Sequence, residues 1–200
     1  RFIGVRVPDI RKTIKSYKNL SLPELKKTLY SPLHELRLAA LLILVQQYKK
    51  QDRSGQKKIY DFYLTHKAQV NNWDLVDLSA QHIVGHYIYS YKKNNIKVLH
   101  ELSASNNIWY RRLSILSTWA YIKHNELEPC FDISGILLAD KEDLLHKAVG
   151  WMLREAWKRD SEKVEYFIKT NYDQMPRTML RYAIEKMEES KRKMFLKGKF

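Results

Sequence analysis

A short pattern of residues recurs along the chain at a nearly constant interval, and this recurrence constrains the fold more than any other feature. Each copy begins with a polar or charged residue and continues with small and apolar ones; the four copies are Arg37-Leu38-Ala39-Ala40-Leu41, Asp77-Leu78-Ser79-Ala80, Arg112-Leu113-Ser114-Ile115-Leu116 and Lys147-Ala148-Val149-Gly150. Their first residues stand at positions 37, 77, 112 and 147, so the intervals are 40, 35 and 35 residues. Arrays of helix pairs repeat at this interval, because each pair buries its apolar face against the next. The sequence therefore predicts an all-α chain of repeated helix pairs that form a curved solenoid.

The four copies fit the second helix of HEAT-type pairs, which often carries a polar residue followed by small and apolar positions. The small residues Ala39, Ser79, Ser114 and Ala148 would let neighbouring helices approach closely. If the second helices line the inner surface, the first residues of the copies project onto one concave face. Residues 1–200 are accordingly expected to form a single domain of HEAT-like repeats.

Helix-start signals agree with this architecture. Ser21 is followed three residues later by Glu24, which is the spacing of a capping box at a helix N-terminus. The chain has only six glycines and five prolines, which favours long helices joined by short loops. We expect helices over residues 8–17, from residue 21, from residue 31, over 73–87 with Asn72 as cap, over 109–123 with Asn106 or Asn107 as cap, over 141–158 and over 177–189 after Pro176, with a charged tail over 186–199.

The charge balance indicates a polyanionic partner. The chain has 36 Lys and Arg against 22 Asp and Glu, a formal net charge of +14. A surplus of this size favours DNA, RNA or an anionic membrane surface, although a generally basic surface that aids solubility is the alternative. The single cysteine, Cys130, excludes an internal disulfide or a thiolate zinc site and favours a reducing compartment. No signal peptide and no apolar run of about 18 residues is present, so we expect a cytoplasmic protein that is neither exported nor membrane-spanning.

Two tryptophans and one acid are expected on the same surface as the repeated positions. Trp73 stands four residues before Asp77 and Trp151 stands four residues after Lys147, so each pair shares one side of its helix. One face would then carry these four residues together with Arg112. An acid surrounded by cations and flanked by two large aromatic side chains is unusual on a solvated surface. This group is the strongest chemical signal in the chain.

Each member of the group also has a structural interpretation. Asp77 could be an ordinary ion-pair partner of Arg112 rather than a functional carboxylate. Trp73 and Trp151 could be core residues, because tryptophans in helices are usually at least half buried. The remaining tryptophans fit packing roles better and are assigned to them; they are Trp109, Trp119 and Trp157.

Further cations lie in or near the expected second helices and form a stripe suited to a phosphate backbone. They are Arg111, Arg112, Lys147, Arg154, Arg177 and Arg181. A stripe of charges can also be a solvated face, but the net surplus favours binding. His82 and His86 are four residues apart, yet no third ligand or zinc-binding pattern accompanies them, so we interpret them as structural and expect no metal or cofactor.

Several short blocks, in order along nearly the whole chain, resemble the AlkD-like DNA alkylation repair glycosylases. The blocks are Gly4-Val5-Arg6-Val7-Pro8-Asp9-Ile10-Arg11, Asn72-Trp73-Asp74-Leu75-Val76-Asp77, Trp109-Tyr110-Arg111-Arg112, Gly150-Trp151-Met152-Leu153-Arg154-Glu155 and Met175-Pro176-Arg177. The family is built from HEAT-like helix pairs, in agreement with the interval found above. Its members usually carry a further helix ahead of the first block, which this sequence does not contain.

The resemblance implies a specific activity and site. Trp73, Asp77 and Trp151 match the catalytic cleft positions, Arg112 matches the arginine of that cleft, and Arg6 joins the candidate DNA contacts. Family members hydrolyse the N-glycosidic bond of cationic lesions such as N3-alkyladenine and N7-alkylguanine in double-stranded DNA, without drawing the base into a pocket. The resemblance also implies a prokaryotic, nucleoid-associated monomer that needs no metal or cofactor. Two alternatives stay open: a non-catalytic DNA-binding protein on the same scaffold, and a helical scaffold that binds a protein or RNA.

Overall fold

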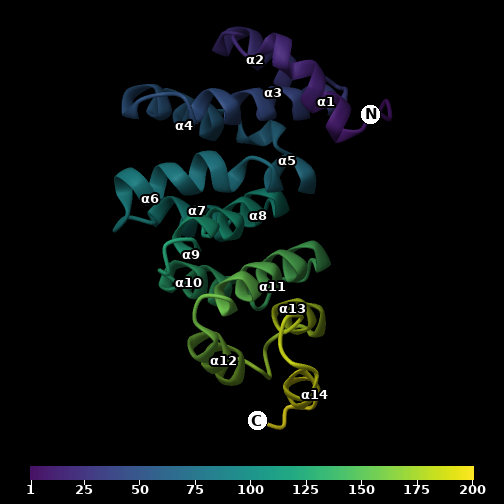
Figure 1. Ribbon diagram of the computed structural model, residues 1–200, viewed down its shortest axis with the longest axis vertical. Coiled ribbons are helices and arrows are strands. Elements are labelled where there is room, and N and C mark those ends of the chain that lie inside the picture. Colours follow the sequence, from purple (N-terminus) through teal and green to yellow (C-terminus); the bar gives the residue numbers. More distant parts are fainter. The chain divides into compact units, whose positions relative to one another are not determined.

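The computed structural model describes residues 1–200 and contains helices and no strands. The predicted all-α class and the pairing of helices are therefore confirmed (Figure 1). The chain divides into two compact units, Arg1–Tyr91 and Lys92–Phe200. The single domain, the curvature and the concave face expected from the sequence stay predictions. None of the helices is both long and apolar enough to cross a membrane.

The first unit is built around one long apolar helix. Its elements are α1 (Val7–Thr13), the 3-10 helix η1 (Ile14–Tyr17), α2 (Leu22–Leu29), α3 (His34–Tyr48), α4 (Arg53–Thr65), the 3-10 helix η2 (Lys67–Gln69), α5 (Trp73–Asp77), the π-helix η3 (Gln81–Gly85) and α6 (His86–Lys92). Residues 40–45 of α3 are all buried, so this helix is covered on every side. It packs against α2, α4 and α5, and thereby fixes where α5 begins.

The second unit repeats the packing of consecutive helices against each other. Its elements are α7 (Lys97–Ser103), α8 (Ile108–Ser117), α9 (Trp119–Ile122), α10 (Glu128–Leu137), α11 (Asp143–Trp157), α12 (Ser161–Thr170), α13 (Arg177–Ala183) and α14 (Glu189–Lys197). The pairs are α7 with α8 and α10 with α11, while α12 and α13 both pack against α11. The central helix is α11, which packs against α8, α10, α12 and α13. Gly150 allows α11 and α13 to approach closely, since a Cβ there would lie 2.5 Å from the carbonyl oxygen of Met179 on α13.

The structure contains some, but not all, of the helix caps expected from the sequence. The capping box is present, with the Ser21 backbone N–H donating to the Glu24 carboxylate at 2.7 Å. Asn107 caps α8 by accepting from the Trp109 N–H at 2.9 Å. Asn72 occupies the cap position of α5, but its side chain makes no cap hydrogen bond. The helix expected from residue 31 begins at His34 instead.

Three other expectations are corrected by the structure. The helix predicted over residues 73–87 is interrupted after Asp77 and continues as a π-turn. The helix predicted over 109–123 is interrupted at Thr118, whose hydroxyl donates to the Ile115 carbonyl at 2.7 Å. The segment predicted as a charged tail forms α14, because Phe195 is buried and Glu188 caps the helix start. The start signals also missed four helices, which are α4, α7, α10 and α12.

Candidate functional site

The first unit presents Trp73 and Asp77 one turn apart on the short helix α5. Trp73 is 53% exposed, so the interpretation of this residue as a core tryptophan is wrong. Asp77 is partly exposed at the other end of the helix. Between them, Leu75 and Val76 are fully buried and anchor the opposite side of α5. The helix therefore turns an indole and a carboxylate outward from the same side.

A largely buried hydrogen bond holds the start of α5. His34, the first residue of α3, lies 2.7 Å from the Asp74 carboxylate through its Nε2. The His34 side chain is almost completely enclosed, and the ring of Phe2 lies 4.4 Å from its centroid. Because α3 is the core helix of the unit, this hydrogen bond ties the first turn of α5 to the buried centre of the unit.

A chain of buried hydroxyls holds the end of α5. The Ser79 N–H donates to the carbonyl of Val76, so the regular partner of the Leu75 carbonyl is missing. The Ser79 hydroxyl replaces it, donating to the Leu75 carbonyl at 2.5 Å. That hydroxyl has one proton, so Tyr63, 2.8 Å away on α4, must donate to it. Burial, and to a smaller extent the charge of Asp77, raise the pKa of Tyr63, which therefore keeps the proton that it donates.

These contacts explain the shape of the segment. Ser79 closes the last turn of α5 through its side chain, and the chain then enters the π-turn η3. Turns of this kind often accompany functional sites, since they change the direction of nearby side chains. Sequence reasoning identified Ser79 only as a small residue and missed Tyr63 and His34 altogether. No local signal marks these two, because they act on α5 from helices distant in the sequence.

The second unit contains Arg112, Lys147 and Trp151. Arg112 on α8 is only 5% exposed, and its Nη1 donates to the Leu144 carbonyl of α11. Lys147 on α11 lies 2.6 Å from Asp143, and this partner raises the pKa of Lys147. Trp151, one turn further along α11, is half-buried. This unit thus brings a fixed guanidinium and a partly exposed indole to α8 and α11.

The other predicted cations differ in how far they are committed to internal partners. Arg111 is bound to Asp140, with Nε at 2.6 Å, and to the Ser105 carbonyl. Arg154 pairs with Glu185. The more accessible ones are Arg6, 84% exposed beside Asp9 at 3.5 Å, Arg177, which reaches the Tyr172 hydroxyl and the Leu196 carbonyl, and Arg181, which is exposed and has no ion pair.

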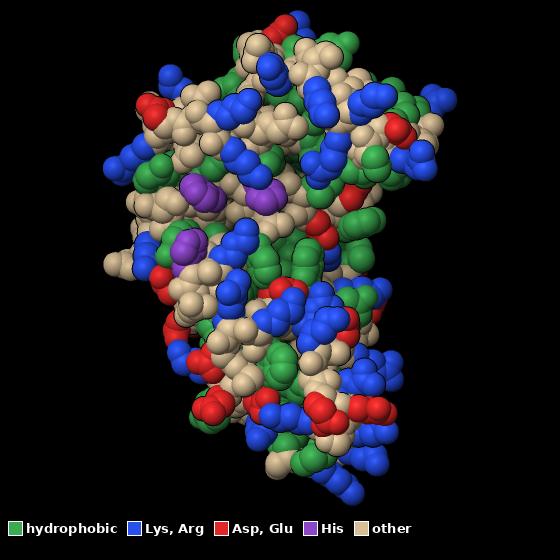
Figure 2. Space-filling model, viewed as in Figure 1, with side chains coloured by type: hydrophobic (Ala, Val, Ile, Leu, Met, Phe, Trp, Pro, Cys, Tyr) green, Lys and Arg blue, Asp and Glu red, His purple; other side chains and the backbone are tan.

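The remaining candidates keep structural positions. Trp109, Trp119 and Trp157 are half-buried, and the Trp157 indole N–H donates to Glu165 at 3.1 Å. No group of three His, Cys, Asp or Glu side chains that could hold a metal ion gathers around His82 and His86 or elsewhere. On the face drawn in Figure 2, Lys and Arg side chains are spread over the first unit with few Asp or Glu among them. The cationic surface expected from the composition is therefore visible on this unit.

Comparison with known proteins agrees with the resemblance noted from the sequence blocks. The family described as DNA alkylation repair enzyme matches residues 1–187. A solved structure described as a predicted DNA alkylation repair enzyme from Enterococcus faecalis is similar in fold, with a TM-score of 0.73 over 94% of this chain and 89% of that chain, at 15% sequence identity. No curated protein matches the chain. Since the family match extends over most of the sequence, the chain belongs to the DNA alkylation repair enzyme family.

Proposed function

We propose that this protein is a monofunctional DNA glycosylase that releases cationic alkylated purines, such as N3-alkyladenine and N7-alkylguanine, from double-stranded DNA. Family membership supports a role in DNA alkylation repair. The single observation that carries the finer proposal is the arrangement on α5, where an indole that is 53% exposed stands one turn from a partly exposed carboxylate. The helix that carries both side chains is held at its start by the bond of His34 to Asp74 and at its end by Tyr63 and Ser79.

The chemistry of the lesion fits these two side chains. An alkylated purine that already carries a positive charge is a good leaving group, so the enzyme need not protonate it. The remaining barrier is the positive charge that develops on the deoxyribose as the N-glycosidic bond breaks. A fixed carboxylate stabilises that charge and can orient the attacking water, and the face of an indole attracts a cation. We assign the first role to Asp77 and the second to Trp73 and Trp151.

The cations take supporting roles in this proposal. Arg112 is nearly buried and bonded to α11, so it serves as a guanidinium whose position the protein sets, rather than a flexible phosphate contact. Arg6, Arg177 and Arg181 are the more accessible candidates for phosphate binding. Lys147, Arg111 and Arg154 are weaker ones, because each already pairs closely with a carboxylate.

The test is base release from DNA that contains 7-methylguanine, measured with protein in excess over DNA. Asp77→Asn should lower the rate of release by about a hundredfold, the lower end of the range for removal of one well-placed electrostatic group. Asp61→Asn is the matched control, since Asp61 is an exposed acid of the same unit that pairs with Lys57 on α4. It should leave the rate unchanged.

Two outcomes would defeat the proposal. One is a wild-type rate no higher than spontaneous depurination. The other is tight DNA binding and base release that Asp77→Asn does not alter. Tight binding without release would instead favour a non-catalytic DNA-binding protein on this scaffold.

A further inference from the structure

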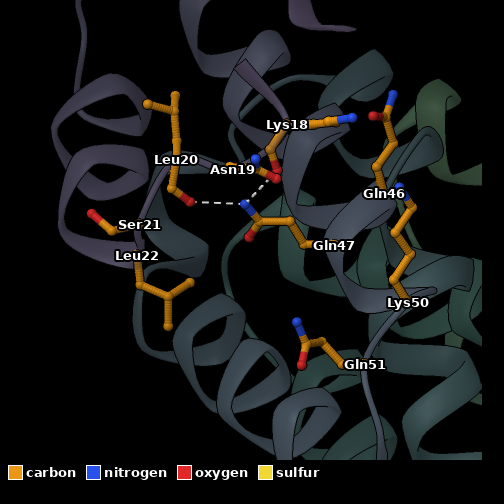
Figure 3. A pocket seen from close by; sticks show the side chains of 9 residues that line it. All are labelled: Lys18, Asn19, Leu20, Ser21, Leu22, Gln46, Gln47, Lys50 and Gln51. Atoms are coloured by element: carbon orange, nitrogen blue, oxygen red, sulfur yellow. Dashed lines mark hydrogen bonds between the residues drawn. The ribbon is translucent and has the colours of Figure 1, made fainter. Parts of the chain in front are cut away.

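A polar crevice lies in the first unit at the C-terminal end of α3, with a volume of about 360 Å³ (Figure 3). The loop between η1 and α2 forms one wall, and the last turn of α3 forms the other. Its polar side chains are mainly ammonium and carboxamide groups, namely those of Lys18, Asn19, Gln46, Lys50 and Gln51. We call this set the amide–lysine crevice. No carboxylate lines it.

The crevice is preformed. Gln47 donates both amide hydrogens to the opposite wall, to the Lys18 carbonyl at 2.9 Å and the Leu20 carbonyl at 2.8 Å. The dashed lines of Figure 3 mark these two bonds, which fasten the loop to α3. A ligand in the crevice would therefore find its walls in place and would not have to order the loop.

The side-chain donors that line the crevice have no partners within the protein. Lys18 and Lys50 form no ion pair, and the side-chain amides of Asn19, Gln46 and Gln51 form no hydrogen bond. Acids near the crevice are engaged elsewhere, because they cap helices. Glu24 accepts from Ser21, and Asp52 accepts from Gly55 at 2.8 Å. The crevice thus concentrates positive charge and hydrogen-bond donors that nothing neutralises.

An adjoining hollow shares Leu22, Gln47 and Gln51 with the crevice. It adds Lys58 on α4 and also Asp52, whose carboxylate accepts from the Gly55 N–H. The start of α2 contributes the positive end of a helix dipole, whereas the end of α3 contributes a negative one. The two dipoles oppose each other, so the lysines determine the sign of the potential. A row of lysines and amides suits a run of phosphate groups better than a single small anion.

The crevice is separate from the site on α5. α3 runs between them, with His34 at its first turn bonded to α5 and the crevice at its last turn. A helix of this length spans roughly 20 Å at 1.5 Å per residue. Side chains around Asp77 therefore do not reach the crevice, and a ligand there is not the reacting nucleotide.

We infer that the amide–lysine crevice binds phosphate groups of a DNA backbone and forms a second DNA contact on the first unit. Lys18, Lys50 and Lys58 neutralise phosphates, and the carboxamides donate to their oxygens. The contact reads charge and spacing and carries no base preference. It does not depend on glycosylase activity, so it stands or falls separately from the function proposed for Asp77.

The experiment compares the salt dependence of binding to a fluorescent, undamaged DNA duplex. Lys18→Gln/Lys50→Gln should reduce the slope of log K against log salt by about 1.8, since each neutralised phosphate contributes about 0.9. The matched control is Lys57→Gln/Lys97→Gln, which removes the same charge from two exposed lysines that already pair with Asp61 and Glu101. This control should change the slope much less.

A second experiment, an NMR titration of the wild-type protein, locates the contact. Adding the duplex should shift the side-chain amide signals of Asn19 and Gln46 in an NMR spectrum of the wild type, and inorganic phosphate at the same phosphate concentration should shift them far less. Equal slopes for the two double variants would overturn the inference. So would amide signals that do not move with DNA, or that move equally with inorganic phosphate, which would indicate a site for free phosphate. These readings do not involve base release, so a protein that fails the glycosylase test can still pass this one.

Discussion

Replacing Gly150 by alanine tests the packing that joins α11 to α13. A Cβ at this position would lie 2.5 Å from the Met179 carbonyl oxygen, 2.5 Å from the Cβ of Tyr182 and 3.3 Å from the backbone nitrogen of Ala183. Two of these atoms belong to the backbone and the third is directly attached to it, so no side-chain rotation relieves the contact. The two helices must therefore move apart.

Two opposing terms set the size of the effect. Alanine in place of glycine stabilises a helix interior by up to about 1 kcal/mol. Forcing an extra methyl group into a packed contact costs about 1–3 kcal/mol. At 2.5 Å from a backbone oxygen we expect the upper part of that range, which leaves a net loss of about 1–2 kcal/mol. For a chain of this size the melting temperature should fall by about 2–8 °C.

Gly135→Ala provides a control of opposite sign. Gly135 also lies within a helix of the second unit, α10, but a Cβ there would meet nothing within 4 Å. The propensity gain should then appear alone, with a rise of about 1–4 °C. Thermal unfolding followed by circular dichroism at the helix band measures both variants. A Gly150→Ala protein as stable as the wild type, beside a stabilised Gly135→Ala protein, would refute the close approach of α11 and α13.

Three further predictions concern buried groups. Burial opposes ionisation of Glu35, but backbone N–H donors outweigh it and lower the pKa of Glu35 in the fold. Its stabilising effect is therefore present above the usual glutamate range and is lost as pH falls through the lowered pKa. Protection of the N-terminal amides against exchange should fall there, whereas in Glu35→Gln it should be weak at every pH. Ser79→Ala should lower the free energy of unfolding in urea by about 2–3 kcal/mol, because it leaves both the Leu75 carbonyl and the Tyr63 hydroxyl without a partner. Ser114→Ala leaves only the Leu99 carbonyl without a partner and should cost about 1 kcal/mol. Equal losses would contradict the chain of hydroxyls. Burial raises the pKa of the Cys130 thiol to about 12, so a thiol reagent at neutral pH should label this residue only after the protein unfolds. Rapid labelling of the native protein would contradict the burial of Cys130.

The repeat interval was sufficient to predict the fold, since it depends on a physical requirement that every pair shares. Each second helix needs small residues where it meets its neighbours, and Gly150 and Ser114 meet that need in the structure. The outward position of Trp73 and Asp77 was also accessible from sequence, because residues four apart share one side of a helix. The sequence could not show which of the two units each site residue belongs to, because the repeat interval carries no information about how tightly successive helix pairs pack.

The interruption after Asp77 shows why the detail of the site could not be foreseen. The apolar pattern continues through residues 75–84, and a continuous helix satisfies it equally well. What ends α5 is the capture of the Leu75 carbonyl by Ser79, supported by a tyrosine hydroxyl sixteen residues earlier in the chain. A serine within a helix usually bonds its own backbone, and only the fold decides whether a buried partner makes that bond permanent.

The basic residues show a different limit of sequence-based prediction. The sequence gives the number of charges, but only the fold shows which cations pair with a carboxylate. Arg111 and Arg181 look equivalent in a list of basic residues, yet Arg111 is held by Asp140 while Arg181 is exposed and unpaired. A carboxylate that pairs with an arginine cancels that arginine's contribution to the positive potential around the protein, even though the net charge of +14 is unchanged. Acids that cap helices do the reverse, since they leave nearby lysines such as Lys18 and Lys50 without partners. DNA affinity in this protein should therefore follow the unpaired lysines and arginines, and neutralising a paired one should alter binding far less than its formal charge suggests.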